Sequence, residues 1–536
     1  MTCRRDGERG QVLPLAAILM TGLIAMVALL FTSGEALRYR RQLQDASDAA
    51  ALAAANLLVA QNGCSQTGNG GSPRSAIVSA ARNSISTNLP RYNLSDVAVT
   101  CPTGYSNFAV KVTLSGTASS WFGPNGLNLG STSTAINGQT GGGSYSVALL
   151  DPSNPNWRSQ RNGCPSYEIN GGVTVTYEGS IFVNSACTRS DSLNAALKGI
   201  NSAFSMRMIN NSQMYIVGEY ASGTAGHITP DPIQNTWPPL GDPLGGLIKP
   251  CHATDGTACL GTSGTLPSRS MATSGQGSGS SQCKQGSTVL DPCILLPGTY
   301  SGGILAGTGS SPTTLLLRPG VYYIEGGGLQ LKSGSARIIS IPAAGTLSDT
   351  LARQHYATSL TDAQVGAQWQ QDCPAPVVGN PNPSTCGVMI YNAKSDSKSS
   401  WTTSGGNADA VNNGAQGVLL LRSYNPSTDS LGAGSTFNSY RNLVMWQARS
   451  PAPGSSSPQP DLSMAGGACV TLSGTVYAPG GKILFGGASC GSGGGADTTT
   501  TLQFICWDLS LSGNNNFYFA FRADAFTQPM GYGLVE

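Results

Sequence analysis

Charged side chains and histidines are scarce in this chain of 536 residues. Only 10% of the residues are charged, against about a quarter in an average globular protein, and the formal net charge is +2. Nucleic-acid binding usually requires a clustered basic face, so this composition excludes nucleic acid as a partner. The chain has three histidines and no C-x-x-C pair, which leaves few ways to build a zinc site. We therefore predict no metal and no bound cofactor.

With so little charge, the surface must be covered by small polar residues. Glycine reaches 70 and hydrophobic residues make up 40% of the chain. A surface of Ser, Thr, Asn and Gly is what we expect of a secreted, β-rich protein. The chain is also too long for one ordinary compact core, so the length predicts two or more domains unless an elongated repeat takes it up.

The cysteines indicate an oxidising compartment. Thirteen of the fourteen lie between Cys64 and Cys506, and because thirteen is odd, at least one is free or pairs with another chain. Cys251, His252 and Cys259 would be the best zinc candidate, although their spacing is unusual for such a site. Three pairs are close enough in sequence for local disulfides: Cys164 with Cys187, Cys283 with Cys293, and Cys373 with Cys386.

One long apolar run lies near the N-terminus. No charged residue occurs from Gln11 to Ser33, and Val12 to Phe31 supplies the ~20 residues that a helix needs to cross a bilayer core. We predict a transmembrane helix over residues 12–33. A cleavable signal peptide is the alternative, but its apolar region should span roughly 7–15 residues. The predicted anchor residues are Val12, Leu15, Ile18, Leu23, Ala25, Val27, Leu30 and Phe31.

An alanine-rich stretch follows the run and predicts that the helix continues. Apolar residues recur there at alternating spacings of three and four, which is typical of one helix face. Gln42, Gln44, Asp45, Ser47 and Asp48 fall on the other faces. Two interpretations stay open, packing within this chain and packing against neighbouring subunits of a filament. The predicted packing seam consists of Leu43, Ala46, Ala50, Ala53 and Leu57.

Polar phrases flank the apolar run on both sides. Glu8-Arg9-Gly10-Gln11 precedes it, and Tyr39-Arg-Arg-Gln-Leu-Gln-Asp45-Ala-Ser-Asp48 follows it, leading into alanines up to Ala55. This pattern resembles the N-terminal module of Flp pilus-assembly TadE/TadG-like proteins. The resemblance implies an inner-membrane helix, a cytoplasmic N-terminus and an association with pilus-assembly subunits. Leu15 stands where pilin-type signals carry Glu, counting from Gly10, which counts against pilin-like processing and leaves Gly10 as a weak cleavage candidate.

Orientation does not follow from the flanking arginines, because they occur on both sides of the run. The cysteines decide it, since a disulfide-capable region belongs outside the cytoplasm. We therefore expect a single-pass protein of a bacterial cytoplasmic membrane, with its N-terminus inside and most of the chain outside.

Three regions are expected along the chain. Residues 1–62 form the N-terminal module, and residues 63–142 form a small, pilin-like α+β region with a helix over Ser75 to Asn88 and an alternating strand over Phe108 to Leu114. Residues 146–536 form a mainly β, Gly-rich domain of short strands. Ser192 to Ile209 and Thr346 to Gln371 are predicted to be helical insertions in that domain.

A repeated phrase indicates the architecture of the β domain. Leu296-Pro-Gly-Thr-Tyr300 recurs as Arg318-Pro-Gly-Val-Tyr322, with the prolines 22 residues apart, and a spacing of about 20–30 residues suits one coil of a stacked solenoid. Stacking would join the apolar positions of successive coils into one interior. We predict a parallel β-helix-like fold, with a β-sandwich as the alternative.

Catalytic signatures are weak. Gly487-Ala-Ser489-Cys-Gly491 fits the nucleophile-elbow pattern, but no histidine follows it and the next residues are glycines, so we assign no catalytic residue. The leading hypothesis is a structural or assembly component of a Flp/Tad-type pilus. A membrane-tethered adhesin that binds an extracellular glycan or surface is the first alternative, and a polysaccharide-active β-helix enzyme is the second.

Overall fold

The computed structural model is mainly β, with one long N-terminal apolar helix. Contacts divide the chain into two compact units, residues 1–141 with 529–536 (unit 1) and residues 142–528 (unit 2). The described residues are 12–58, 64–65, 71–102, 109–118, 126–139, 145–152, 164–188, 195–199, 204–224, 226–236, 240, 242–252, 259–261, 265–269, 282–285, 288–307, 312–375, 385–395, 401–402, 409–412, 417–449, 459–464, 469–486, 498–513, 516–522, 525–526 and 530–534.

Unit 1 is organised around helix α1 (Val12–Ala55). Its 44 residues correspond to a length of about 66 Å at 1.5 Å per residue, and Ala and Leu, the best helix formers, dominate it. Helix α2 (Ser75–Asn88) has the range expected from the sequence and buries Ile77, Ala81 and Ile85. A short 3-10 helix, η1, covers Leu94–Asp96.

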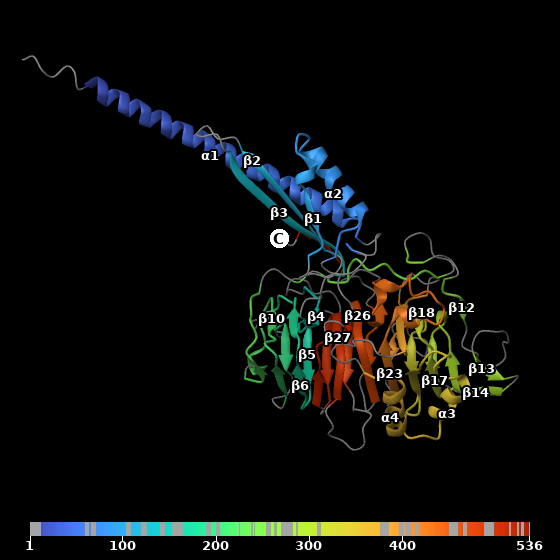
Figure 1. Ribbon diagram of the computed structural model, residues 1–536. Coiled ribbons are helices and arrows are strands. Elements are labelled where there is room, and N and C mark those ends of the chain that lie inside the picture. The colour runs from blue at the N-terminus through green and yellow to red at the C-terminus, as the bar shows by residue number, and fades with distance from the viewer. Residues whose placement is uncertain are drawn as a thin grey trace, which may run out of the picture. The chain divides into compact units, whose positions relative to one another are not determined.

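An antiparallel sheet completes unit 1, and the C-terminal half of α1 packs on it (Figure 1). The cross-strand pairs run along the whole of β2, from Ala109 opposite Ile136 to Ala118 opposite Leu127. A disulfide between Cys64 and Cys101 closes the unit. The strand order is β1 (Ala98–Thr100), β2 (Ala109–Ala118), β3 (Leu127–Gln139) and β29 (Met530–Leu534).

Strand β29 differs from the expected domain plan, in which residues 146–536 form one region. It pairs with β3 in unit 1, with Tyr532 opposite Asn137 and Leu534 opposite Ala135. The reason is that β3 has a free edge once β2 covers the other, and backbone groups along an edge favour a further strand. Sequence alone does not show which distant segment supplies it.

Unit 2 consists of short strands in three parallel ladders, which we call ladders 1, 2 and 3. Ladder 1 contains β12 (Ser268–Arg269), β15 (Gly298–Ser301), β18 (Gly320–Glu325), β21 (Gly387–Ala393), β24 (Leu443–Gln447), β26 (Cys469–Gly486), β27 (Thr498–Ser512), β4 (Tyr145–Leu149), β7 (Ser180–Val183) and β10 (Met214–Ile216), in order of pairing.

The other two ladders share the long strands β26 and β27 with ladder 1. Ladder 2 contains β16 (Ile304–Ala306), β19 (Leu329–Leu331), β22 (Val411–Asn412), β25 (Leu462–Met464), β26, β27, β5 (Tyr167–Asn170) and β8 (Leu197–Gly199). Ladder 3 contains β14 (Thr288–Leu295), β17 (Thr314–Leu317), β20 (Arg337–Ser340), β23 (Val418–Ser423), β26, β27, β28 (Asn516–Phe519), β6 (Thr174–Tyr177), β9 (Ser205–Met208) and β11 (Ile228–Thr229).

The register of these ladders agrees with the spacing of the repeated phrase. Gly298 pairs with Tyr322, 24 residues later, and Cys293 pairs with Leu315, 22 residues later. The rings of Tyr300 and Tyr322 from the two copies stack at 5.9 Å. Among the described strands of unit 2, the pair of β13 (Gln282–Gln285) and β14 is antiparallel and the remaining pairs are parallel, unlike the antiparallel sheets of a β-sandwich.

The strands do not stack in chain order. The last long strand, β27, pairs with the first strand of the unit, β4, placing Phe504 opposite Val147 and Cys506 opposite Leu149. Strand β28 likewise pairs with β6. We call these contacts the closing joint. Figure 1 shows it as strands near the C-terminus, in red, lying between green and orange strands. The chain therefore enters unit 2 in the middle of the stack, at β4, and first forms the end that contains β10 and β11. It then crosses to the opposite end, at β12, and returns to the middle through β26 and β27.

The segment that crosses from β11 to β12, described at residues 240, 242–252, 259–261 and 265–267, lies along the outer side of ladder 1. Ile248 accepts a hydrogen bond from Tyr440 Oη at 2.6 Å, and the ring of His252 packs edge-on against Tyr323 at 4.8 Å. Beneath it, aromatic side chains of adjacent strands form a buried row, namely Tyr323, Tyr391, Trp446 and Tyr477. These aromatic residues form a core under the segment and are not a surface open to ligands.

Two predicted helical insertions have different outcomes. Thr346 to Gln371 contains α3 (Asp349–His355) and α4 (Asp362–Asp372), which confirms the prediction. The prediction of a helix over Ser192 to Ile209 is wrong, because this segment contains strands β8 and β9. Met206 and Met208 are buried whereas Ser205 and Arg207 are exposed, and this period of two is that of a strand. Three further 3-10 helices lie at Ser222–Thr224, Pro426–Thr428 and Asn438–Tyr440.

Candidate functional site

The N-terminal part of α1 exposes a row of large apolar side chains. Within the described residues, α1 is the one helix long and apolar enough to cross a membrane. Of the predicted anchor residues, Ile18, Leu23, Ala25, Val27, Leu30 and Phe31 are exposed, with 70% of Ile18 and 43% of Val27 accessible. Val12 and Leu15 belong to the helix, but their side chains lie outside the described residues. Each such side chain left in water forgoes about 1.5–3 kcal/mol of burial.

The polar side chains within this stretch are satisfied by the helix itself. Thr21 Oγ1 donates to the Ala17 carbonyl at 2.7 Å, and Thr32 Oγ1 donates to the Ala28 carbonyl at 2.9 Å. In a hydrocarbon environment an unpaired hydroxyl would cost several kcal/mol, so this local pairing makes the stretch compatible with lipid.

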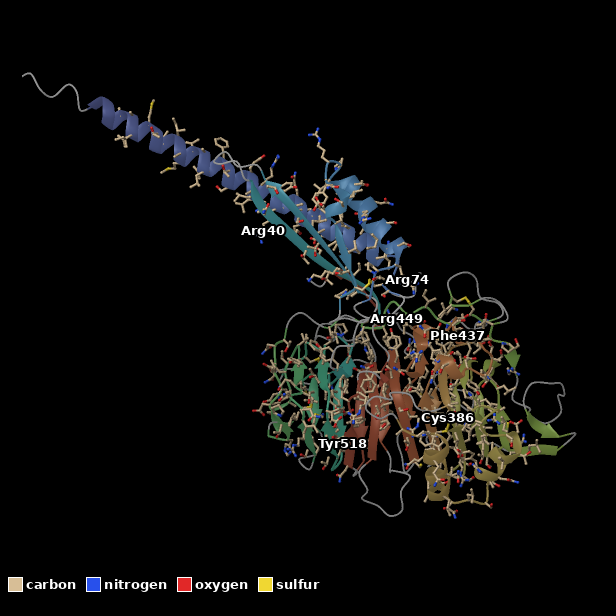
Figure 2. All side chains as sticks on the ribbon, in the orientation of Figure 1. Arg40, Arg74, Cys386, Phe437, Arg449 and Tyr518 are labelled. Atoms are coloured by element: carbon tan, nitrogen blue, oxygen red, sulfur yellow. A yellow bond between two sulfur atoms is a disulfide. The ribbon has the colours of Figure 1, made fainter. Side chains whose placement is uncertain are left out.

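Basic residues follow the apolar stretch directly. Arg38, Arg40 and Arg41 are exposed, and Arg38 pairs with Glu35 at 3.4 Å. Arg40 is labelled on the helix in Figure 2. Long cationic side chains at the end of an apolar helix can keep their charge in the headgroup region while their stems cover apolar surface.

The second half of α1 has one face buried in unit 1. Leu43, Ala46 and Ala50 of the predicted seam are fully buried, whereas Ala53 and Leu57 are half-buried. The buried row continues instead through Ala54 and Leu58. The reason is that a seven-residue repeat drifts by about 20° every two turns of a helix with 3.6 residues per turn, so additional four-residue steps are needed to stay on one face. Alanine at these positions allows the backbone of α1 to lie close to β3.

A polar network fixes the same face of α1 on β3. Ser47, expected on another face, is fully buried, and its hydroxyl lies 2.7 Å from Ser131 Oγ and 2.8 Å from Ser133 Oγ. Gln44 accepts from Ser131 Oγ at 2.8 Å, and Asp48 accepts from Ser133 Oγ. Buried hydroxyls need such partners, so the polar residues of the alanine-rich phrase hold the helix in register on the sheet.

The disulfides bear on the compartment. Cys164 is bonded to Cys187 and Cys373 to Cys386, as the spacing suggested. Cys293 is also in a disulfide, while the side chain of Cys283 lies outside the described residues. Cys251 is bonded to Cys259, so these thiols are not available as zinc ligands. Among the described cysteines, Cys506 is free and buried.

A pair of buried carboxyl groups lies at the closing joint. Asp508 is in β27, opposite Lys482 of β26, and it shares a hydrogen bond with Asp151, which follows β4. Burial, followed by repulsion from Asp151, raises the pKa of Asp508 well above its usual range. Within the described ranges, no group of three or more His, Cys, Asp or Glu side chains is arranged to hold a metal ion.

A pocket of about 300 Å³ lies beside the same joint. Its lining comes from the β6–β7 turn, including Glu178, from the β9–β10 turn, including Asn210 and Asn211, and from Phe521 and Arg522 after β28. Tyr518, labelled in Figure 2, donates to Glu178 at 2.6 Å. No sequence pattern indicated this pocket, because its three segments lie far apart along the chain.

The elbow-like phrase, residues 487–491, lies outside the described residues.

Comparisons with known proteins concern the N-terminal part of the chain. Residues 10–57 match the family model described as putative Flp pilus-assembly TadE/G-like, which confirms the resemblance seen in the sequence. The match spans the apolar stretch and the packed half of α1. No curated protein and no solved structure gives a significant match to the chain.

Proposed function

We propose that this protein is a membrane-anchored structural or assembly component of a Flp/Tad-type pilus or of a related adhesion machinery. The observation that carries the proposal is the coincidence of the family match, over residues 10–57, with one continuous helix that is exposed and apolar in its first half and packed in its second. Such a helix couples a membrane span rigidly to a folded unit.

The proposed topology is single-pass, with a cytoplasmic N-terminus and both units outside the cytoplasm. Four disulfides with both partners described support this side for the units, because such bonds persist in oxidising compartments. Protease digestion of spheroplasts carrying a tag at either end tests the topology. We expect digestion of the tag after Glu536 and protection of the tag before Met1, and the reverse pattern would exclude this orientation.

We further propose that unit 2 is a parallel β-helix-like extracytoplasmic domain. Support comes from the parallel pairing of strands 22 to 25 residues apart in the first coils and from the shared apolar interior of the three ladders. We assign no catalytic activity to it. A role as a rigid spacer or contact surface suits a stacked architecture, in which each coil contacts only its neighbours.

The role of the packed half of α1 follows from its burial. Ala46 and Ala50 of the seam are buried against β3 and α2 within the same unit, which supports packing inside this chain over packing against a neighbouring subunit. Contacts with other pilus components would then involve the apolar stretch within the membrane or the outer surfaces of the two units.

Deletion of the gene followed by electron microscopy of the cells tests the pilus role. Piliation and adhesion should be lost, should return with the wild-type gene, and should not return with a variant whose apolar stretch is interrupted by a charge. A matched variant that carries the same charge after the stretch, Leu37→Arg, should restore them. Unchanged piliation in the deletion strain would refute the proposed function.

A further inference from the structure

We infer that the pocket beside the closing joint binds a neutral saccharide, a function that goes beyond the pilus-related role. Its volume of about 300 Å³ is at the lower end for small-molecule sites and is adequate for about one sugar ring. The inference rests on which groups line the pocket and on which of them have unused hydrogen-bonding capacity.

Glu178 organises the pocket and already accepts three hydrogen bonds. Its carboxylate accepts from the Phe521 N–H at 2.9 Å and from Arg522 at 2.9 Å, in addition to Tyr518. Burial raises the pKa of Glu178, but these hydrogen bonds outweigh burial and hold the pKa below its ordinary value. The Glu178 charge is paired with Arg522, so the pocket has no net charge to attract an ionic ligand.

The ring of Phe521 occupies space that a side chain at Gly179 would otherwise fill. A Cβ atom at Gly179 would lie 2.4 Å from Phe521 Cδ2 and 2.3 Å from Ser146 Oγ. Glycine is therefore required there for the ring to reach its position. Phe521 is half-buried and lines the pocket, and an aromatic ring in such a position offers an apolar face to the C–H groups of a sugar.

Two side-chain amides are available on the other side of the pocket. Asn210 and Asn211 are both exposed and both adopt left-handed backbone conformations, with φ of 58° and 59°. Within the part of the chain that the structure describes, neither amide group bonds to another protein group. Each amide carries donors and an acceptor, which matches the donor and acceptor character of sugar hydroxyls. Amides, one guanidinium edge and one aromatic face together favour a neutral polyhydroxylated ligand.

The test uses the full-length chain in a detergent without a sugar headgroup, because such a headgroup would compete. Glucose, galactose, mannose and N-acetylglucosamine are the probes, with galacturonate as the charged comparison, and saturation-transfer NMR measures binding at millimolar concentrations. We expect at least one neutral sugar to bind. Asn211→Gly should weaken that binding by about tenfold or more, because it removes the amide while glycine tolerates the left-handed backbone.

Asn235→Gly is the matched control, because Asn235 is also exposed and left-handed, with φ of 55°, but does not line the pocket. It should leave binding unchanged. Asn210→Gly provides a second variant if Asn211→Gly lowers the melting temperature. The inference would be overturned by an absence of binding to all neutral sugars, by preferential binding of galacturonate, or by equal binding of wild type and both pocket variants.

Discussion

Substituting Ala25 by Arg should prevent stable membrane insertion of α1. Ala25 lies in the apolar stretch and is exposed, so in a membrane-spanning helix an Arg there would be surrounded by lipid. The stretch from Val12 to Phe31 contains eleven Leu, Ile, Val and Phe residues, which together favour insertion by about 3–7 kcal/mol at ~0.3–0.6 kcal/mol each. A central Arg costs ~2.5–3.5 kcal/mol on the same scale, and therefore offsets between about two fifths and all of that gain.

This cost corresponds to a roughly 60- to 300-fold lower insertion equilibrium constant. Alkaline extraction of isolated membranes, followed by immunoblotting of pellet and supernatant, measures the retained fraction. Leu37→Arg is the matched control, because Leu37 is 62% exposed on the same helix but lies after the apolar stretch. Its retention should equal that of the wild type. Equal retention of the Ala25→Arg chain would refute the interpretation of this stretch as the anchor.

Three further predictions concern the folded units. Ser47→Ala should lower the free energy of unfolding by about 1–3 kcal/mol through the loss of its buried hydrogen bonds, whereas exposed Gln42→Ala should change it by less than ~0.5 kcal/mol in the same urea titration. Phe485→Ala should cost about 3–5 kcal/mol, because this buried ring contacts three others at 5.4 to 6.0 Å, and a loss below ~1 kcal/mol would contradict that packing. The third substitution, Asp508→Asn, tests a pH dependence. The raised pKa of Asp508 contributes stability that is complete below its unfolded pKa of about 3.9 and is lost as pH rises through the folded pKa. The melting temperature of the wild type should therefore fall more between pH 4 and pH 8 than that of the Asn variant, and parallel pH profiles would contradict the assignment.

Features that depend on nearby residues were accessible from the sequence. The apolar stretch, the range of α2 and the 22-residue repeat each follow from composition or periodicity within a short window. The Cys164–Cys187 and Cys373–Cys386 disulfides belong to the same class, because a short loop keeps two thiols close. The strands at 197–208 were missed because the two-residue alternation of the buried methionines is short.

Features that depend on distant pairing were not accessible. The closing joint joins β27 to β4 across more than 350 residues, and β29 joins β3 across nearly 400. Which strand covers a given edge depends on which other edges are already paired, and a strand's own sequence specifies only its faces. The pocket at Glu178 and the carboxyl pair at Asp508 exist only because the joint brings their segments together.

The sequence by itself therefore determined an apolar helix suited to a membrane, a family resemblance over its first tenth, and a β-rich, disulfide-bonded remainder. Only the tertiary structure decided that Ser47 is buried in a polar network on β3 and that β27 and β28 pair with β4 and β6. It also decided that a pocket forms beside that joint. The physical reason is that side-chain periodicity encodes burial locally, whereas strand partners and sites between segments are selected by the packing of the whole chain.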